Sequence, residues 1–381
     1  MTTPTKKRIL SGIKPTGTPH IGNYAGMLLP MLQLAANHAD QDVFMFVADY
    51  HALNNADARK NLGPLGRELT ATLLALGFDP KTCTFYRQSD VPEVFELASF
   101  LTNFTPKGLM NRAHAYKGEV GPLIDQIIRS ADEFKKQHHG HNFKEIYSPT
   151  GYLKRVEIVG SDTFIEFVDP DIGVNMGLYN YPILMAADIL LYDIDRVPVG
   201  RDQRQHIEIA RDIAGYVNNA YGQDLLKLPE GVYQADTQEV PGIDGRKMSK
   251  SYGNVLPIFA EAAEVEKIVK KIKTDSKLPA EPKDKDNLLV KFHQAMSTPE
   301  QHADFLARFL PGGPSGMGYG DAKKEVMAAH EAKFGKARDE YKRLMAAPGE
   351  LDSILKMGAE KARDVAGPVL RRIRKAAGFS A

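Results

Sequence analysis

The N-terminal half of the chain alternates short apolar runs with longer amphipathic segments. Three short runs are typical of strands: KRILSGI (7–13), DVFMFVADY (42–50) and CTFYRQSD (83–90). Three longer segments carry the apolar stripe of a helix: 20–37, 61–78 and 92–104. Strands that alternate with helices predict βαβ units and an α/β fold with a doubly wound, Rossmann-like parallel sheet.

The alternation breaks at residues 111–175, which we interpret as an insertion between βα units. It contains a helical pattern at 122–137, and two alternating runs at 152–159 and 163–168 predict a β-hairpin. The earlier rhythm then resumes with a helix at 179–192, a strand at 196–199 and a helix at 202–217. Helical patterns fill 256–381, with breaks near 275–283 and 310–320. We therefore predict a catalytic domain at 1–255 that includes the insertion, and an α-helical C-terminal domain at 256–381.

Composition narrows the class of protein. The 381 residues are 43% hydrophobic and 25% charged, which is ordinary for a globular protein, and the net charge of +1 does not indicate a nucleic-acid partner by itself. One cysteine, Cys83, allows neither an internal disulfide nor a cysteine-based zinc site. No run approaches 18 apolar residues, and the polar start MTTPTKKRIL is not typical of a signal peptide. We expect a cytoplasmic enzyme without a membrane span.

The stretch TPHIGN (18–23) lies where the first predicted strand turns into a helix. In a doubly wound sheet this is the carboxyl edge, where ligands bind, and free N–H groups at a helix start hold phosphates. Gly22 would let a flat ligand approach, and His20 could donate to a phosphate oxygen. An ordinary strand–turn–helix with a surface histidine explains the stretch equally well on its own.

The stretch GRKMSKSYGN (245–254) has neither a helical nor a strand pattern, and glycines bracket its cations. Lys247 and Lys250 are point charges on flexible stems, which suit a triphosphate whose charge moves during a reaction. A solvated basic loop is the ordinary alternative. The two motifs each occur once and in this order, so their joint occurrence by chance is improbable.

A third candidate lies in YPILMAAD (181–188). Tyr181, Met185 and Asp188 are spaced i, i+4, i+7 and share one helix face. A carboxylate among apolar residues is costly to bury without a donor, and an indole N–H would be a suitable one. A structural partner for Asp188, and core packing for Met185, remain the alternatives at this level.

HIGN followed by KMSKS resembles the class I aminoacyl-tRNA synthetases, and the longer blocks resemble the tryptophanyl-tRNA synthetase family. Five blocks carry this resemblance: 11–28, 47–54, 179–192, 197–214 and 247–251. The resemblance implies an ATP site formed by His20, Gly22, Asn23, Gly200, Asp202, Lys247, Met248, Ser249 and Lys250. It implies a tryptophan pocket formed by His51, Tyr181, Met185, Asp188, Val197, Val199 and Gln203. Within these sets, His20, Lys247 and Lys250 would be the catalytic residues, Asp202 would hold the ribose, and Asp188 would accept the indole N–H.

The implied reaction has two steps. Tryptophan reacts with ATP, bound with Mg²⁺, to give tryptophanyl-adenylate and pyrophosphate, and the adenylate then acylates the terminal adenosine of tRNA(Trp). The resemblance also implies a homodimer and no tightly bound cofactor, and it makes the helical C-terminal domain the tRNA-binding part. Four cations near the end of that domain could contact tRNA or could complement a helix dipole: Arg371, Arg372, Arg374 and Lys375.

Three other functions remain as alternatives. The nearest is a tyrosyl-tRNA synthetase, whose pocket commonly has Gln where this chain has Met185. The others are a small-molecule nucleotidyltransferase and a catalytically dead, synthetase-like RNA-binding protein. The aminoacyl-pocket blocks and the helical tail argue against the second, and intact His20, Lys250 and Asp202 argue against the third.

Three departures from the family pattern stand out. Lys14 replaces the usual Gln of the first turn, and it could add a further cation to the ATP site or point to solvent. YGN follows the second serine of KMSKS, where an acidic residue is common. The insertion is longer than usual and contains HHGH (138–141), which lacks the cysteines or clustered carboxylates of a metal site, so we expect none there.

Overall fold

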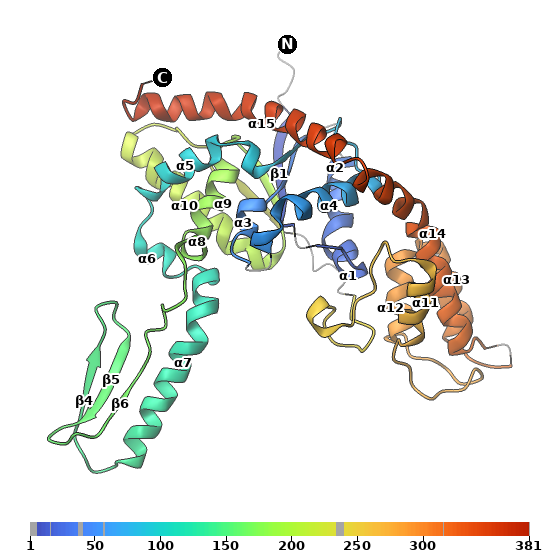
Figure 1. The fold of residues 1–381 in the computed structure, drawn as a ribbon, viewed down its shortest axis with the longest axis horizontal. Helices are drawn as coiled ribbons and strands as arrows, with labels where there is room; N and C mark the ends of the chain where they lie inside the picture. Colours follow the sequence, from blue (N-terminus) through green and yellow to red (C-terminus); the bar gives the residue numbers. More distant parts are fainter. Residues whose placement is uncertain are drawn as a thin grey trace. The chain divides into compact units, whose positions relative to one another are not determined.

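The structure is a computed structural model that describes residues 6–15, 17–36, 41–55, 58–233, 240–314 and 316–380 (Figure 1). The described residues form two compact units. The first unit takes its residues from Met1–Glu93, Tyr192–Asp202 and Glu230–Ala381. The second unit takes its residues from Val94–Leu191 and Gln203–Pro229.

A five-stranded parallel sheet forms the centre of the first unit. Its order is β3-β2-β1-β7-β8, and every adjacent pair is parallel. The strands are β1 (Lys7–Ile13), β2 (Gln41–Val47), β3 (Thr84–Arg87), β7 (Arg196–Val199) and β8 (Glu230–Tyr233). The strands β2 and β3 lie on one side of β1, and the later strands β7 and β8 lie on its other side. The predicted doubly wound α/β fold is confirmed, and the switch point lies between β1 and β7.

Helices from both ends of the chain complete the first unit. The N-terminal ones are α1 (Ile21–Asn23), η1 (Tyr24–Leu28), α2 (Leu29–Ala36), α3 (Asp49–Ala52), η2 (Ala58–Lys60), α4 (Leu62–Ala75) and η3 (Gln88–Asp90). The later ones are η4 (Arg201–Gln203), which ends in the second unit, η5 (Lys250–Tyr252), α11 (Ala262–Lys270), α12 (Leu288–Met296), α13 (Pro299–Phe309), α14 (Tyr319–Met345) and α15 (Pro348–Ala376). One cluster of buried side chains joins the sheet to these later helices. Its members include Leu28, Met45, Phe305 and Phe334.

The helix α15 packs on β3, the last strand at one end of the sheet. Gly358 of α15 lies so close to the backbone of Phe85 that an added Cβ would be 1.6 Å from the Phe85 carbonyl oxygen. Two ion pairs fix the same helix, Arg67 with Asp352 at 2.7 Å and Arg372 with Asp193 at 2.7 Å. Glycine is therefore required at 358, because any side chain would separate helix and strand.

The second unit holds the insertion. Its helices are α5 (Glu93–Thr102), α6 (Lys107–Met110), α7 (His114–Gln137), α8 (Met176–Tyr179), α9 (Tyr181–Leu190) and α10 (Arg204–Tyr221). The strands β4 (Phe143–Tyr147), β5 (Leu153–Ile158) and β6 (Phe164–Glu166) form an antiparallel sheet beside α7 (Figure 1). The predicted hairpin is present as β5 and β6, but β4 makes it a three-stranded sheet.

Several predicted boundaries were wrong. The strand predicted for 83–90 ends at Arg87, after which η3 begins. The strand predicted for 42–50 ends at Val47, because the buried carboxylate of Asp49 accepts hydrogen bonds from the backbone N–H groups of Tyr50 and Ser89 and turns the chain into α3. The helix predicted for 20–37 contains the π turn η1, whereas its last predicted residue, Asn37, lies outside the described residues. Pro30 has no N–H for the carbonyl four residues earlier, which favours a wider turn just before it.

Candidate active site

The turn after β1 holds His20 in a defined orientation. His20 is the N-cap of α1: its Nδ1 accepts the Asn23 N–H at 3.2 Å, and its own N–H donates to Asn23 Oδ1 at 3.2 Å. Because Nδ1 is an acceptor, the proton of the neutral ring is on Nε2. Burial lowers the pKa of His20 to about 4, and the charge of Lys250 acts in the same direction. His20 is thus a neutral Nε2–H donor at pH 7.

The KMSKS stretch packs directly on this turn. Met248 is buried, and its sulfur lies 3.3 Å from where a Cβ on Gly22 would be. The segment that follows pairs with the turn, since the Ile21 N–H donates to the Leu256 carbonyl at 3.0 Å and the Ile258 N–H donates to the Pro19 carbonyl at 3.2 Å. The two motifs, more than 200 residues apart in the sequence, are therefore adjacent in the structure.

Asn254 organises the loop that carries the two lysines. Its side chain is 2% exposed and accepts the Ser249 N–H at 2.9 Å. Its Nδ2 donates to Asp244 Oδ1 at 2.8 Å and to the Lys247 carbonyl at 3.0 Å. A Cβ on Gly242 would be 2.1 Å from the same nitrogen, so the loop closes tightly around this amide. Three hydrogen bonds thus connect the Asn254 side chain to Asp244, which precedes KMSKS, and to Lys247 and Ser249, which lie within it.

The YGN sequence after KMSKS has a structural role in this loop. Gly253 adopts a positive φ of +62°, which a residue with a side chain rarely adopts, and it delivers Asn254 to the interior. The ring of Tyr252 lies 4.9 Å from the Arg246 guanidinium, which itself bonds Asp244. The departure from the family pattern therefore supplies the residues that hold the loop in place.

The second lysine reaches the turn after β1. The Lys250 ammonium is 3.1 Å from where a Cβ on Gly17 would be, and Gly17 has a φ of +83°. Burial lowers the pKa of Lys250, and the carboxylate of Glu68 opposes this shift. Glu68 accepts a hydrogen bond from Thr18 at 2.6 Å. Lys250 thus lies near residues 17–23, the turn that carries HIGN and that we call the signature turn. Its acidic neighbour Glu68 was not predicted from the sequence.

Lys14 and Lys250 line one cavity of about 760 Å³ at the carboxyl ends of β1 and β2. His51, at the end of β2, lines it too, and burial lowers the pKa of Lys14. The remaining lining residues include Pro15, Asn54, Asn61, Leu65 and Ser251. Lys247, by contrast, is not among the residues that line this cavity. The structure therefore brings together two of the three lysines predicted for an anionic ligand.

Gly200 and Asp202 follow β7, on the other side of the switch point from His20. A Cβ on Gly200 would be 2.5 Å from Asp202 Oδ1, so a side chain at 200 would displace this carboxylate. Asp202 is exposed at the start of η4. A carboxylate in this position can accept hydrogen bonds from vicinal hydroxyl groups.

The residues predicted for the amino-acid pocket fall in both units. Tyr181, Met185 and Asp188 lie on α9, and Asp188 is 2% exposed. The Tyr181 ring meets His206 of α10 edge to face at 5.3 Å, and Gln203 is the N-cap of α10. Both helices belong to the second unit. The other predicted pocket residues, His51, Val197 and Val199, belong to the first unit, where Val197 is buried.

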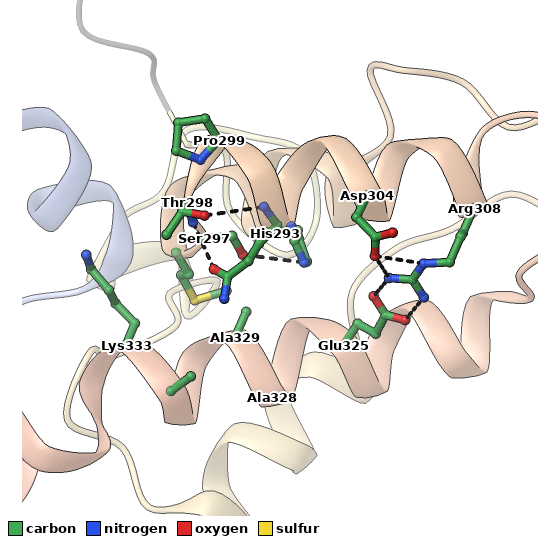
Figure 2. Close-up of a pocket in the computed structure, with 13 residues that line it drawn as sticks. His293, Ser297, Thr298, Pro299, Asp304, Arg308, Glu325, Ala328, Ala329 and Lys333 are labelled. Carbon is green, nitrogen blue, oxygen red and sulfur yellow. Dashed lines mark hydrogen bonds and ion pairs between the residues drawn. The ribbon is translucent and has the colours of Figure 1, made fainter.

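A second cavity of about 670 Å³ lies in the C-terminal helices (Figure 2). His293 of α12 and Thr298 at the start of α13 face α14, and the Arg308 guanidinium joins Asp304 to Glu325. His293 stacks on Phe305 at 4.2 Å between ring centroids. The arginine and the two carboxylates of this cavity thus pair with one another, and none of the predicted site residues lines it.

The basic end of α15 is partly engaged within the chain. Arg372 bonds Asp193, and Arg374 donates to the Ser380 carbonyl at 3.1 and 2.9 Å. In the insertion, His138 Nδ1 lies 2.9 Å from the Phe134 carbonyl. The described residues contain no group of three or more His, Cys, Asp or Glu side chains placed to hold a metal ion. None of the described helices combines the length and apolar character that crossing a membrane requires.

Comparison with known proteins finds relatives over nearly the whole chain. The model of the family "tRNA synthetases class I (W and Y)" matches residues 3–134 and 153–335, and the stretch between them lies inside the insertion. A tryptophan–tRNA ligase of Pseudomonas putida is 43% identical over 98% of this chain and 74% of its own length. One from Neisseria meningitidis is 41% identical over 98% of both chains. The crystal structure of tryptophanyl-tRNA synthetase from Campylobacter jejuni with ADP and tryptophan matches with a TM-score of 0.75, at 35% identity over 98% of this chain and 100% of that one.

Proposed function

This chain belongs to the class I aminoacyl-tRNA synthetase family of the tryptophan and tyrosine enzymes, and from that premise we propose how its residues act. It is an ATP-dependent ligase that activates tryptophan and transfers it to tRNA. Tyrosine, the alternative amino acid, has less support, because the relatives at 41% and 43% identity are tryptophan–tRNA ligases. The observation that carries the proposal is a contact between Met248 and Gly22. Through it, the loop 240–254 with its two lysines packs on the signature turn.

In the first step, a tryptophan carboxylate oxygen attacks the α-phosphorus of ATP, and the bond to the leaving pyrophosphate breaks. The chain needs no nucleophile of its own for this step, so its contribution is positioning and charge stabilisation. The Nε2–H of His20 donates to a phosphate oxygen, while Asp202 holds the ribose hydroxyls. ATP is used as its magnesium complex, and its triphosphate lies against the lysines.

Lys250, Lys247 and Ser249 act on the pyrophosphate. Lys250 already lies at the turn after β1, within reach of the same phosphates as His20. Lys247 is exposed, and its side chain can turn toward the triphosphate when ATP is present. Lys14 adds a further cation from the cavity that it shares with Lys250. As the family resemblance implies, the nucleotide also binds at Gly22, Asn23 and Gly200.

Tryptophan is recognised by residues of α9 together with Val197 and Val199. Asp188 is buried among apolar residues, and its carboxylate accepts the indole N–H. Tyr181 and Gln203 hold the amino and carboxyl groups, Met185 packs against the indole, and His51 lies beside the head group. A substrate without the indole N–H loses this hydrogen bond to the Asp188 carboxylate, so we expect it to be activated less efficiently.

The second substrate is tRNA(Trp), with the C-terminal helices 256–381 as its main binding region beside the catalytic part at 1–255. Arg371 and Lys375 are the more available of the four terminal cations, because Arg372 and Arg374 have partners within the chain. We further propose a homodimer in the cytoplasm, as the family resemblance implies.

The test is amino-acid-dependent exchange between ATP and labelled pyrophosphate, with tryptophan and with tyrosine. We expect exchange with tryptophan to be at least about 100-fold more efficient than with tyrosine, as buried polar recognition gives. Exchange with tyrosine alone would refute the choice of tryptophan, and exchange with neither would refute the synthetase activity.

A variant makes this test specific to the pocket. Asp188→Asn keeps the size of the side chain but replaces one acceptor oxygen by a donor NH₂ group. We expect its KM for tryptophan to rise about tenfold or more, with the KM for ATP unchanged. Unchanged tryptophan kinetics would remove Asp188 from the pocket.

A further inference from the structure

A buried histidine of α14 contacts the segment 256–258, which pairs with the signature turn. His330 is fully buried, and its Nε2 lies 3.0 Å from the carbonyl oxygen of Pro257. A carbonyl oxygen only accepts, so Nε2 carries the proton. Nδ1 of the same ring is buried and has no hydrogen-bond partner. Burial also lowers the pKa of His330, which keeps the ring neutral, so it donates one hydrogen bond and this bond goes to Pro257.

Pro257 lies opposite His20. The two residues form an antiparallel bridge, and the hydrogen bonds of Ile21 with Leu256 and of Ile258 with Pro19 flank it on both sides. The backbone on both sides of His20 is thus fixed by the segment 256–258. A shift of that segment would move His20 with it.

A second contact from α14 reaches the same turn. Phe334, one helical turn after His330, meets the ring of Tyr24 edge to face at 5.0 Å. Tyr24 directly follows Asn23, whose side chain accepts the backbone N–H of His20. His330 and Phe334 also contact each other at 5.2 Å between ring centroids. His330 and Phe334 of α14 therefore both stabilise the signature turn, the first through Pro257 and the second through Tyr24.

We propose that His330 is a positioning residue for ATP: its hydrogen bond to the Pro257 carbonyl holds segment 256–258 against the signature turn and so places the His20 donor at the phosphates. The proposal rests on the proposed function, because it takes ATP as the ligand of His20. His330 itself touches neither substrate. Its effect is on the nucleotide, because segment 256–258 pairs with Pro19, His20 and Ile21, and none of these is a residue proposed to bind tryptophan.

The test compares His330→Leu, which removes the donor, with His330→Gln, which keeps an N–H of similar reach. The measurement is tryptophan-dependent ATP–pyrophosphate exchange, normalised to the folded fraction from circular dichroism. We expect His330→Leu to raise the KM for ATP about tenfold, as the loss of one positioning hydrogen bond predicts, with the KM for tryptophan within about twofold of wild type. His330→Gln should restore the KM for ATP to within about threefold of wild type.

His293→Leu is the matched control, because His293 is also a buried histidine of the C-terminal helices but stacks on Phe305 instead of contacting segment 256–258. We expect its KM for ATP to match wild type. An unchanged KM for ATP in His330→Leu would overturn the proposal, as would an equal rise for ATP and tryptophan or a failure of Gln to restore binding. Loss of the proposed function would look different, because wild type itself would then show no exchange with tryptophan.

Discussion

Lys250 has an acidic neighbour outside the sequence motifs. Glu68 of α4 is held by Thr18 at 2.6 Å and by Tyr341 at 3.4 Å, and its carboxylate favours the charge of the Lys250 ammonium. Without nucleotide, Glu68 therefore acts as a counter-ion for the lysine. A triphosphate has to compete with this carboxylate for Lys250.

Replacing this acid predicts tighter ATP binding. Glu68→Gln keeps an acceptor for Thr18 but removes the negative charge, so we expect the KM for ATP in the exchange assay to fall about threefold, within the range of a partly exposed ion pair. The KM for tryptophan should stay the same. Glu119→Gln makes the same charge change at an exposed site on α7 and should leave both constants unaltered. A KM for ATP that stays constant or rises in Glu68→Gln would contradict the counter-ion role.

At the scale of elements, the loop 240–254 depends on one amide. Asn254→Ala removes the three side-chain hydrogen bonds that join Ser249, Asp244 and Lys247. We expect the exchange rate to fall about tenfold or more and the free energy of unfolding to drop by about 1–3 kcal/mol. Asn254→Asp should be no better, because it places a second carboxylate beside Asp244. A wild-type exchange rate in Asn254→Ala would show that the loop does not need this residue.

Sequence patterns found most elements but not the contacts between them. The strands at 7–13 and 196–199 are well predicted because their apolar runs lie in a parallel sheet. The strand β8 was missed because EGVY is short and mostly exposed at the end of the sheet. Asn254 and His330 were missed for another reason: their roles come from Gly242, Ser249 and Pro257, partners that no local period reveals.

For the whole molecule, buried histidines predict acid sensitivity. His20 and His293 have pKa values lowered to about 4, with burial as the main cause. The unfolded chain takes up their protons near pH 6.5 and the folded chain does not, so stability is full above pH 6.5 and is lost as the pH falls toward 4. After allowance for screening by solvent, each histidine should cost about 1–2 kcal/mol of unfolding free energy at about pH 5.

Urea unfolding at about pH 7.5 and about pH 5 measures this loss. His293→Gln should show a smaller difference between the two pH values than wild type, by about 1–2 kcal/mol, because the contribution of His293 is gone. An equal difference in both proteins would exclude His293 as a source of the acid sensitivity.

The close contact between α15 and β3 has a consequence for how the protein behaves in a crowded solution. The outermost strand of a sheet has backbone groups that can pair with a strand from another molecule, and such exposed edges promote aggregation. Here Gly358 brings a helix onto the Phe85 carbonyl, so that edge is covered by the chain itself. A shortened chain that lacks α15 would present β3 as a template for self-association, and the last helix thus protects solubility as well as completing the fold.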